Sequence, residues 1–173
     1  MRRFRKILPV ILMIWPYLYF VTLILYDKVG EEAYTSISNV YLVLTLIVYI
    51  LNIWNAFSYP HEEMGRKLAF YNMVTKLVHI PFYLCVFSLG VLLILAMVVP
   101  ALLFFSPIVI TILAVIDFFL MATSSMYGVS AAFRLSKNGV ITKPTAVLYS
   151  VLHLVFVVDV ISAVFLYRKA KKI

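Results

Sequence analysis

Two carboxylic acids stand inside long apolar stretches of this sequence. Asp117 is the one Asp, Glu, Lys or Arg residue between Lys76 and Arg134, and Asp159 lies within an apolar run that ends near Tyr167. An ionised carboxylate at the centre of a bilayer costs from about 3 to well over 10 kcal/mol. Each of these acids therefore needs a proton or a partner.

The two acids are expected at similar depth in neighbouring helices, where their carboxyl groups could share one proton. Two like charges close together in apolar surroundings cannot both ionise easily. This pattern predicts a proton- or cation-binding site at Asp117 and Asp159, with Asn52 and Ser124 as further ligands. The alternative is that each acid is neutral and hydrogen-bonded, and only holds the helices together.

The three histidines offer a weaker constellation. His61, His79 and His153 are expected toward one end of the helices, with Glu62 and Glu63 beside the first. Imidazoles and carboxylates are metal ligands, but no H-E-x-x-H or C-x-x-C spacing is present to fix a site. The sequence indicates no cofactor. It also lacks a nucleophile motif and a phosphate-binding glycine loop, which makes an enzyme the less favoured class.

The amino-acid composition predicts that these helices lie in a membrane rather than in water. The 173 residues are 65% hydrophobic and 13% charged, and mean hydropathy is +1.06. Soluble domains carry roughly 25% charged residues, so a soluble domain is excluded. We expect one all-α domain over residues 1–173, an integral membrane helical bundle. The net charge of +8 comes mainly from clusters at helix ends, which favours contact with the lipid bilayer rather than with nucleic acid.

Hydropathy predicts about five transmembrane helices with an interfacial amphipathic helix before the third. The stretch 77–133 is too long to cross a hydrocarbon core about 30 Å thick only once, so it should fold back between Pro100 and Pro107. The polar segment 61–76 should lie along the membrane surface and bend at Pro81. The expected spans are 7–26, 37–59, 81–100, 107–131 and 145–167.

Small residues mark one face of the fourth expected span. Ser124, Gly128 and Ala132 recur at four-residue intervals, a pattern that lets two helix backbones approach closely. Asp117 lies seven residues before Ser124 and therefore on the same face. We expect this seam, including Asp117, to face protein rather than lipid.

Basic residues predict the orientation of the bundle. With five spans, the amino terminus, segment 60–76 and loop 134–143 share the more basic side, which the positive-inside rule places in the cytoplasm. The carboxyl terminus would then lie outside, although the tail 168–172 is itself basic. A four-span alternative, with part of 100–131 re-entrant, would bring that tail inside. The expected location is the cell membrane, most simply a bacterial inner membrane.

Two short runs carry a family resemblance. Lys76-Leu77-Val78-His79-Ile80-Pro81-Phe82-Tyr83 and Thr123-Ser124-Ser125-Met126-Tyr127-Gly128 resemble segments of small multi-span membrane proteins of Gram-positive bacteria that have no assigned function. The resemblance implies no activity.

Two classes of function follow from the sequence. The first is a non-enzymatic accessory component that binds a membrane protein partner or a second copy of itself. The second is a small proton- or cation-coupled transporter that uses Asp117 and Asp159.

Overall fold

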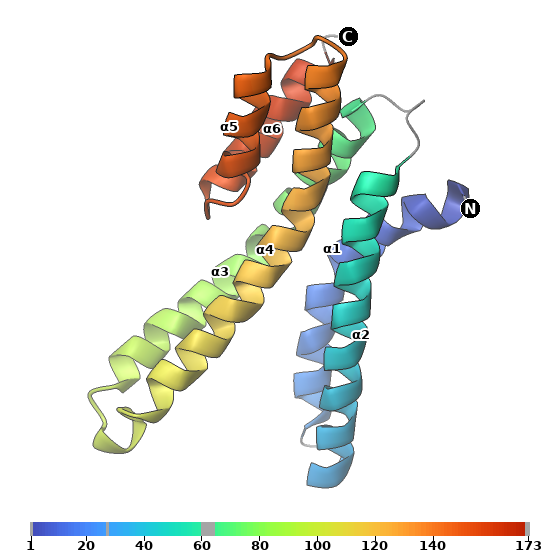
Figure 1. Ribbon diagram of the computed structural model, residues 1–173. Coiled ribbons are helices and arrows are strands. Elements are labelled where there is room, and N and C mark those ends of the chain that lie inside the picture. The colour runs from blue at the N-terminus through green and yellow to red at the C-terminus, as the bar shows by residue number, and fades with distance from the viewer. Residues whose placement is uncertain (1, 27, 60–64, 172–173) are drawn as a thin grey trace.

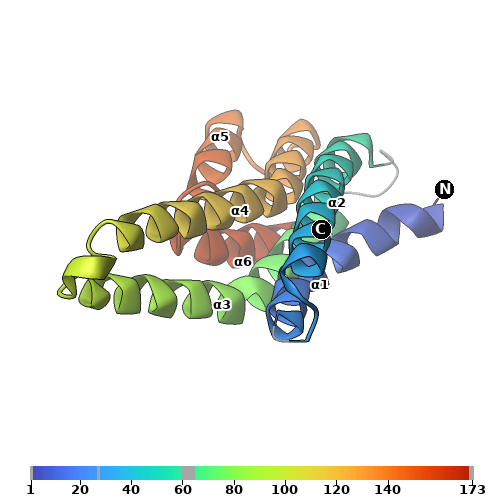
Figure 2. The same ribbon diagram turned by 90° about the horizontal axis from the view of Figure 1, so that it is seen from below.

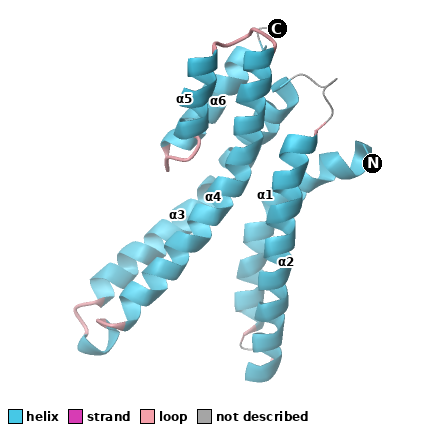
Figure 3. Ribbon diagram, viewed as in Figure 1, coloured by secondary structure: helices cyan, strands magenta, loops and turns pink. Residues whose placement is uncertain are grey.

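The computed structural model describes residues 2–26, 28–59 and 65–171, and within these ranges every element is helical (Figure 3). The elements are α1 (Arg2–Leu25), α2 (Glu31–Ser58), α3 (Gly65–Ala96), the short 3-10 helix η1 (Pro100–Leu102), α4 (Phe105–Lys137), α5 (Lys143–Leu152) and α6 (Val158–Lys171). The predicted all-α class is confirmed. Four helices, α1 to α4, are long and apolar enough to cross a membrane.

The long helices form two antiparallel hairpins, α1–α2 and α3–α4. Figure 1 shows the hairpins meeting near one end and diverging toward the other, and Figure 2 shows α3–α4 reaching away from α1–α2. The first turns of α1 lean away from the rest of that helix, which contains Pro9 and Pro16. Helices α5 and α6 pack on α4 and α3, near the end where the hairpins meet.

The predicted surface helix before the third span is wrong for residues 65–76. Instead α3 runs without interruption from Gly65 through Pro81 to Ala96. Leu68 and Asn72 are buried against other helices, so this segment has protein partners and does not need the membrane surface. The part of the prediction that concerns 61–64 lies outside the described residues.

The fifth predicted helix, 145–167, is also wrong as one element. Helix α5 ends at Leu152, and α6 begins at Val158 and runs back toward the end where α4 finishes (Figure 1). The reversal uses Val157 with a φ of 70°, a left-handed conformation that is unusual for a β-branched residue. The reversal brings Asp159 against α3, in a contact described below.

This reversal changes where the chain ends. Lys171 lies at the same end as loop 138–142, not at the opposite end as five spans require. The segment that doubles back is therefore 143–171, whereas α4 is continuous from Phe105 to Lys137 and so does not fold back within 105–131.

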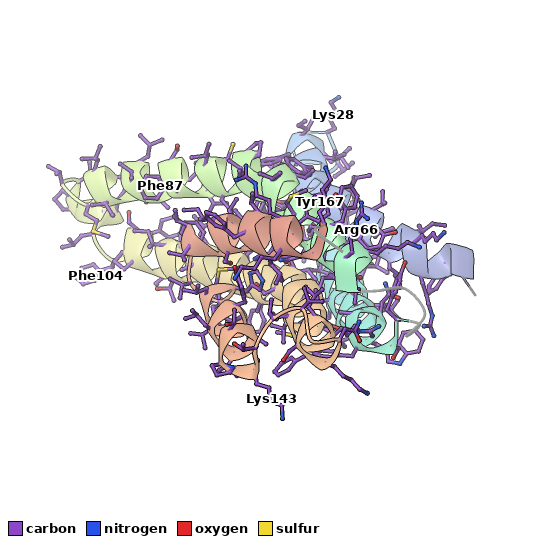
Figure 4. The ribbon with its side chains drawn as sticks, turned by 90° about the horizontal axis from the view of Figure 1, so that it is seen from above. Lys28, Arg66, Phe87, Phe104, Lys143 and Tyr167 are labelled. Atoms are coloured by element: carbon purple, nitrogen blue, oxygen red, sulfur yellow. The ribbon has the colours of Figure 1, made fainter. Side chains whose placement is uncertain are left out.

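Burial is concentrated where the hairpins meet. Leu68, Leu120 and Leu135 are fully buried there, whereas Phe87 and Phe104 near the α3–α4 turn are 64% and 80% exposed. Figure 4 shows these two phenylalanines far from Arg66, which marks the start of α3.

Basic residues gather at that packed end, which we call the basic end. It comprises the starts of α1, α3 and α5, the ends of α2, α4 and α6, and the loop 138–142. Its Lys and Arg residues in the described ranges are Arg2, Arg3, Arg5, Lys6, Arg66, Lys67, Arg134, Lys137, Lys143, Arg168, Lys169 and Lys171. Among the described Lys and Arg residues, Lys28 alone lies in the turn between α1 and α2, at the opposite end (Figure 1).

Candidate functional site: a buried ion pair between α3 and α6

A lysine and an aspartate meet in the interior of the molecule. The Nζ atom of Lys76 lies 2.5 Å from Oδ2 of Asp159, and the two side chains are 0% and 2% exposed. The same ammonium donates to Oγ of Ser125 at 2.9 Å and to Oγ of Ser124 at 3.3 Å. An ammonium has three N–H donors, so each of them has an acceptor here.

The carboxylate is equally well supplied with donors. Asp159 lies in the first turn of α6, where the helix dipole favours a negative charge. Its second oxygen, Oδ1, accepts the backbone N–H of Val160 at 2.7 Å. The pair is therefore fully hydrogen-bonded and carries no net charge, the condition under which charges are tolerated in a protein interior.

A histidine extends this site into the turn between α5 and α6. Nδ1 of His153 lies 2.7 Å from Oγ of Ser162, which also donates to the carbonyl of Asp159 at 2.9 Å. Because a hydroxyl has one proton, this arrangement makes Nδ1–H the donor to Ser162 and leaves Nε2 with a free lone pair. Ser125 donates to the carbonyl of His153, which fastens the turn to α4.

The polar face of α3 was missed by the sequence interpretation, which treated Lys76 as the border of an apolar stretch. Asn72, Thr75, Lys76 and His79 are all fully buried. Their separations of three and four residues put them on one face of the helix. That recurrence of polar residues at helical spacing is the signal that could have located the site.

The predicted small-residue seam of α4 lies against this face. Ser124, Gly128 and Ala132 are buried, the first beside Lys76. A Cβ atom placed on Gly128 would lie 2.5 Å from Nδ2 of Asn72 and 2.6 Å from Nε2 of His153. Gly128 therefore allows side chains from α3 and from the α5–α6 turn to touch the backbone of α4.

Asp117 occupies a separate position on the same seam. Tyr83 lies seven residues, about two turns, after Lys76 on α3. Asp117 lies seven residues before Ser124 on α4, so both steps lead toward the α3–α4 turn. The antiparallel register thus places these two residues opposite each other. No hydrogen bond or ion pair joins the two acids within the described residues, so the structure brings Ser124 to Asp159, through Lys76, but leaves Asp117 apart.

Asn52 belongs to a second polar cluster. Tyr127 donates to Oδ1 of Asn52 at 2.8 Å and accepts from Nδ2 of Asn55 at 3.0 Å. The amide nitrogen Nδ2 of Asn52 donates to the carbonyl of Val48 in its own helix. Asn52 therefore holds α2 against α4 and does not contact the Lys76–Asp159 pair.

His79 and His153 join different pairs of elements. Nε2 of His79 lies 3.0 Å from the carbonyl oxygen of Leu12, so it joins α3 to α1, while His153 joins the α5–α6 turn to α6. His61 lies outside the described residues. In the described ranges, no group of three His, Cys, Asp or Glu side chains could hold a metal ion.

The comparisons with known proteins give a family. The sequence model of a family of unknown function (DUF6652) matches residues 4–172. The chain belongs to this family. The predicted kinship with proteins that have no assigned function is confirmed. Comparison with curated proteins and with solved structures gave no match.

Proposed function

We propose that this chain is an integral membrane protein in which α1 to α4 cross the bilayer and α5–α6 enters it as a re-entrant hairpin from the basic end. Four long apolar helices support this arrangement. The hairpin tip supports it too, because Leu154, Val155, Phe156 and Val157 are all apolar and exposed. Backbone hydrogen bonds from the N–H groups of residues 153, 154, 155 and 159 satisfy part of the backbone at the tip.

The distribution of charge supports an orientation. The basic end would face the cytoplasm, with both termini on that side, because positive residues are retained there. This keeps the predicted cytoplasmic amino terminus and moves the carboxyl terminus to the same side. A reporter fused after Ile173 should be active only in the cytoplasm, and activity outside would contradict the re-entrant hairpin.

Within this arrangement, Lys76 and Asp159 form the proton-binding centre of a small proton-coupled transporter. The observation that carries the proposal is a fully buried ion pair at the inner end of a re-entrant hairpin. Charged groups at membrane depth mark ion pathways, and transporters place such sites where helices are interrupted. A proton that binds Asp159 would neutralise the carboxylate, weaken its bond to Lys76, and so loosen α6 from α3.

Infrared difference spectroscopy on the protein in lipid vesicles tests the proton site. Acidification should produce a protonated carboxyl band that disappears in Asp159→Asn and persists in Glu31→Gln, an exposed acid at the opposite end. Uptake of small solutes should depend on an imposed pH gradient and should be lost in Asp159→Asn. A pH titration with no Asp159-dependent band would overturn the proposal.

A second candidate is the non-enzymatic accessory component. It is favoured by the complete set of partners around Lys76 and Asp159, which suits a static clamp as well as a proton site. A clamp predicts no titration of Asp159 in the accessible pH range. It also predicts a stoichiometric partner protein that co-purifies in mild detergent.

A further inference from the structure

Unpartnered polar atoms line the contact between α3 and α4. Buried side-chain atoms without a hydrogen-bond partner among the described residues are Nδ2 and Oδ1 of Asn72, Oγ1 of Thr75, Nδ1 of His79, the hydroxyl of Tyr83, Oδ1 of Asp117 and Nε2 of His153. All belong to the buried polar face of α3, to the opposing residue of α4 or to the turn beside Gly128. We call this set the seam cluster.

Buried polar atoms in folded proteins are almost always hydrogen-bonded, to protein or to ordered water. Two such atoms, Oδ1 of Asn55 and Oγ of Ser106, lie elsewhere, so the unpartnered atoms of the described chain are concentrated in this one seam. The Lys76–Asp159 pair sits in the middle of the cluster and is itself fully bonded. Protein groups thus satisfy the pair but not its neighbours on either side.

The spacing of the seam cluster suits single water molecules. Asn72, Thr75, His79 and Tyr83 follow one another at three or four residues. At a rise of about 1.5 Å per residue, successive members are roughly 4.5–6 Å apart along the helix axis. One water that hydrogen-bonds to two groups at about 2.8 Å each spans that distance.

The chemistry of the cluster also suits water. Asn72, Thr75 and Tyr83 can donate and accept, while His153 presents a free lone pair at Nε2. His79 likewise has a lone pair at Nδ1, because its Nε2–H donates to the carbonyl of Leu12. Asn72 and His153 both lie against Gly128, so their unpartnered atoms are close to each other.

We propose that water molecules occupy the α3–α4 seam and form a proton path that connects Asn72 and His153 at one end, through the Lys76–Asp159 pair, to Tyr83 and Asp117 at the other. The proton path rests on the function proposed above. In each step a water molecule releases one proton to its neighbour and receives one from behind, so no water is consumed. On arrival an O–H bond forms on Asp159, and the ammonium of Lys76 keeps its bonds to the two serines.

Water-edited solid-state NMR of the full chain in lipid vesicles tests the water directly. The sequence has three histidines, so ¹⁵N-histidine labelling gives few imidazole signals, which His61→Gln and His79→Gln assign. Proton polarisation should pass from water to the rings of His153 and His79. Thr75→Val, which removes one water partner without changing side-chain volume, should reduce transfer to His153 at least severalfold.

Thr111→Val is the matched control, since Thr111 lies exposed on α4 away from the seam. It should leave the transfer unchanged. Absence of water transfer to His153 and His79 in the unaltered chain overturns the inference, and so does equal transfer in the Thr75→Val and unaltered chains. Water transfer without titration of Asp159 supports the filled seam and contradicts the proton function. An Asp159-dependent carboxyl band without water transfer to the histidines supports the proton function and contradicts the water-filled seam.

Discussion

The α3–α4 hairpin is packed in two different ways along its length. Near the basic end, 65–83 and 117–135 bury polar and small side chains against each other and against α6. Toward the turn, 84–116 is almost wholly apolar, and Val86 and Ser106 are the buried residues of that range. The difference shows that the polar half, not the apolar half, forms the interior. In the membrane arrangement proposed above, apolar side chains have no preference for protein over lipid, so polar bonds and close backbone contact decide the packing.

Contacts between the two hairpins follow the same rule. Tyr127 bonds to Asn52, Ser130 donates to the carbonyl of Ala56, and His79 bonds to the carbonyl of Leu12. All of these contacts lie in the polar half of α3–α4. The hairpins diverge where such groups are absent.

The strongest way to break the polar half is to remove one partner of its ion pair. Lys76→Met or Asp159→Leu should lower the free energy of unfolding in detergent by about 3–5 kcal/mol, because each change leaves a buried charge unpaired. The double variant should regain most of this loss, since two apolar side chains need no partners. Chemical denaturation followed by circular dichroism measures all three.

Lys28→Met provides the control for this prediction, because Lys28 is exposed at the opposite end. It should leave unfolding unchanged. Additive losses in the double variant would contradict a direct Lys76–Asp159 interaction.

Two glycines on the same hairpin compare the halves directly. Gly128→Ala should destabilise the protein by about 1–3 kcal/mol, because the added carbon meets Asn72 and His153. Gly90→Ala meets no atom within 4 Å and should be neutral or stabilising by up to about 1 kcal/mol through helix propensity. Equal thermal shifts for the two variants would show that the halves are packed alike.

A smaller effect is expected where the hairpins join. Tyr127→Phe removes the hydroxyl that bonds to Asn52 and Asn55, and should cost about 1–2 kcal/mol. Tyr26→Phe, at an exposed position near the α1–α2 turn, should have no measurable effect on the melting temperature. A Tyr127→Phe variant as stable as the unaltered chain would remove this cluster from the list of contacts that hold the hairpins together.

Much of the fold was predictable from local pattern. Long apolar runs predicted the helices, and the four-residue spacing from Ser124 to Gly128 predicted a closely packed seam, since both depend on residues near in sequence. The end of the chain was not predictable in this way. The apolar run 145–167 suggests one helix, and the contacts that accompany its reversal, such as the bond from Asp159 to Lys76, join residues far apart in sequence.

The candidate site was likewise predictable only in part from the sequence. Sequence alone identified Asp117 and Asp159 as residues that need a proton or a partner, because an ionised carboxylate in an apolar stretch is costly, and it placed Ser124 on a seam that faces protein. It expected Asp117 as the neighbour of Asp159, whereas the structure gives Asp159 the partner Lys76, since depth along a helix says nothing about which helix is adjacent. Tertiary structure decided that Lys76 lies opposite, because the α5–α6 reversal brings α6 against α3 and an ammonium satisfies a buried carboxylate in a way that a second acid cannot.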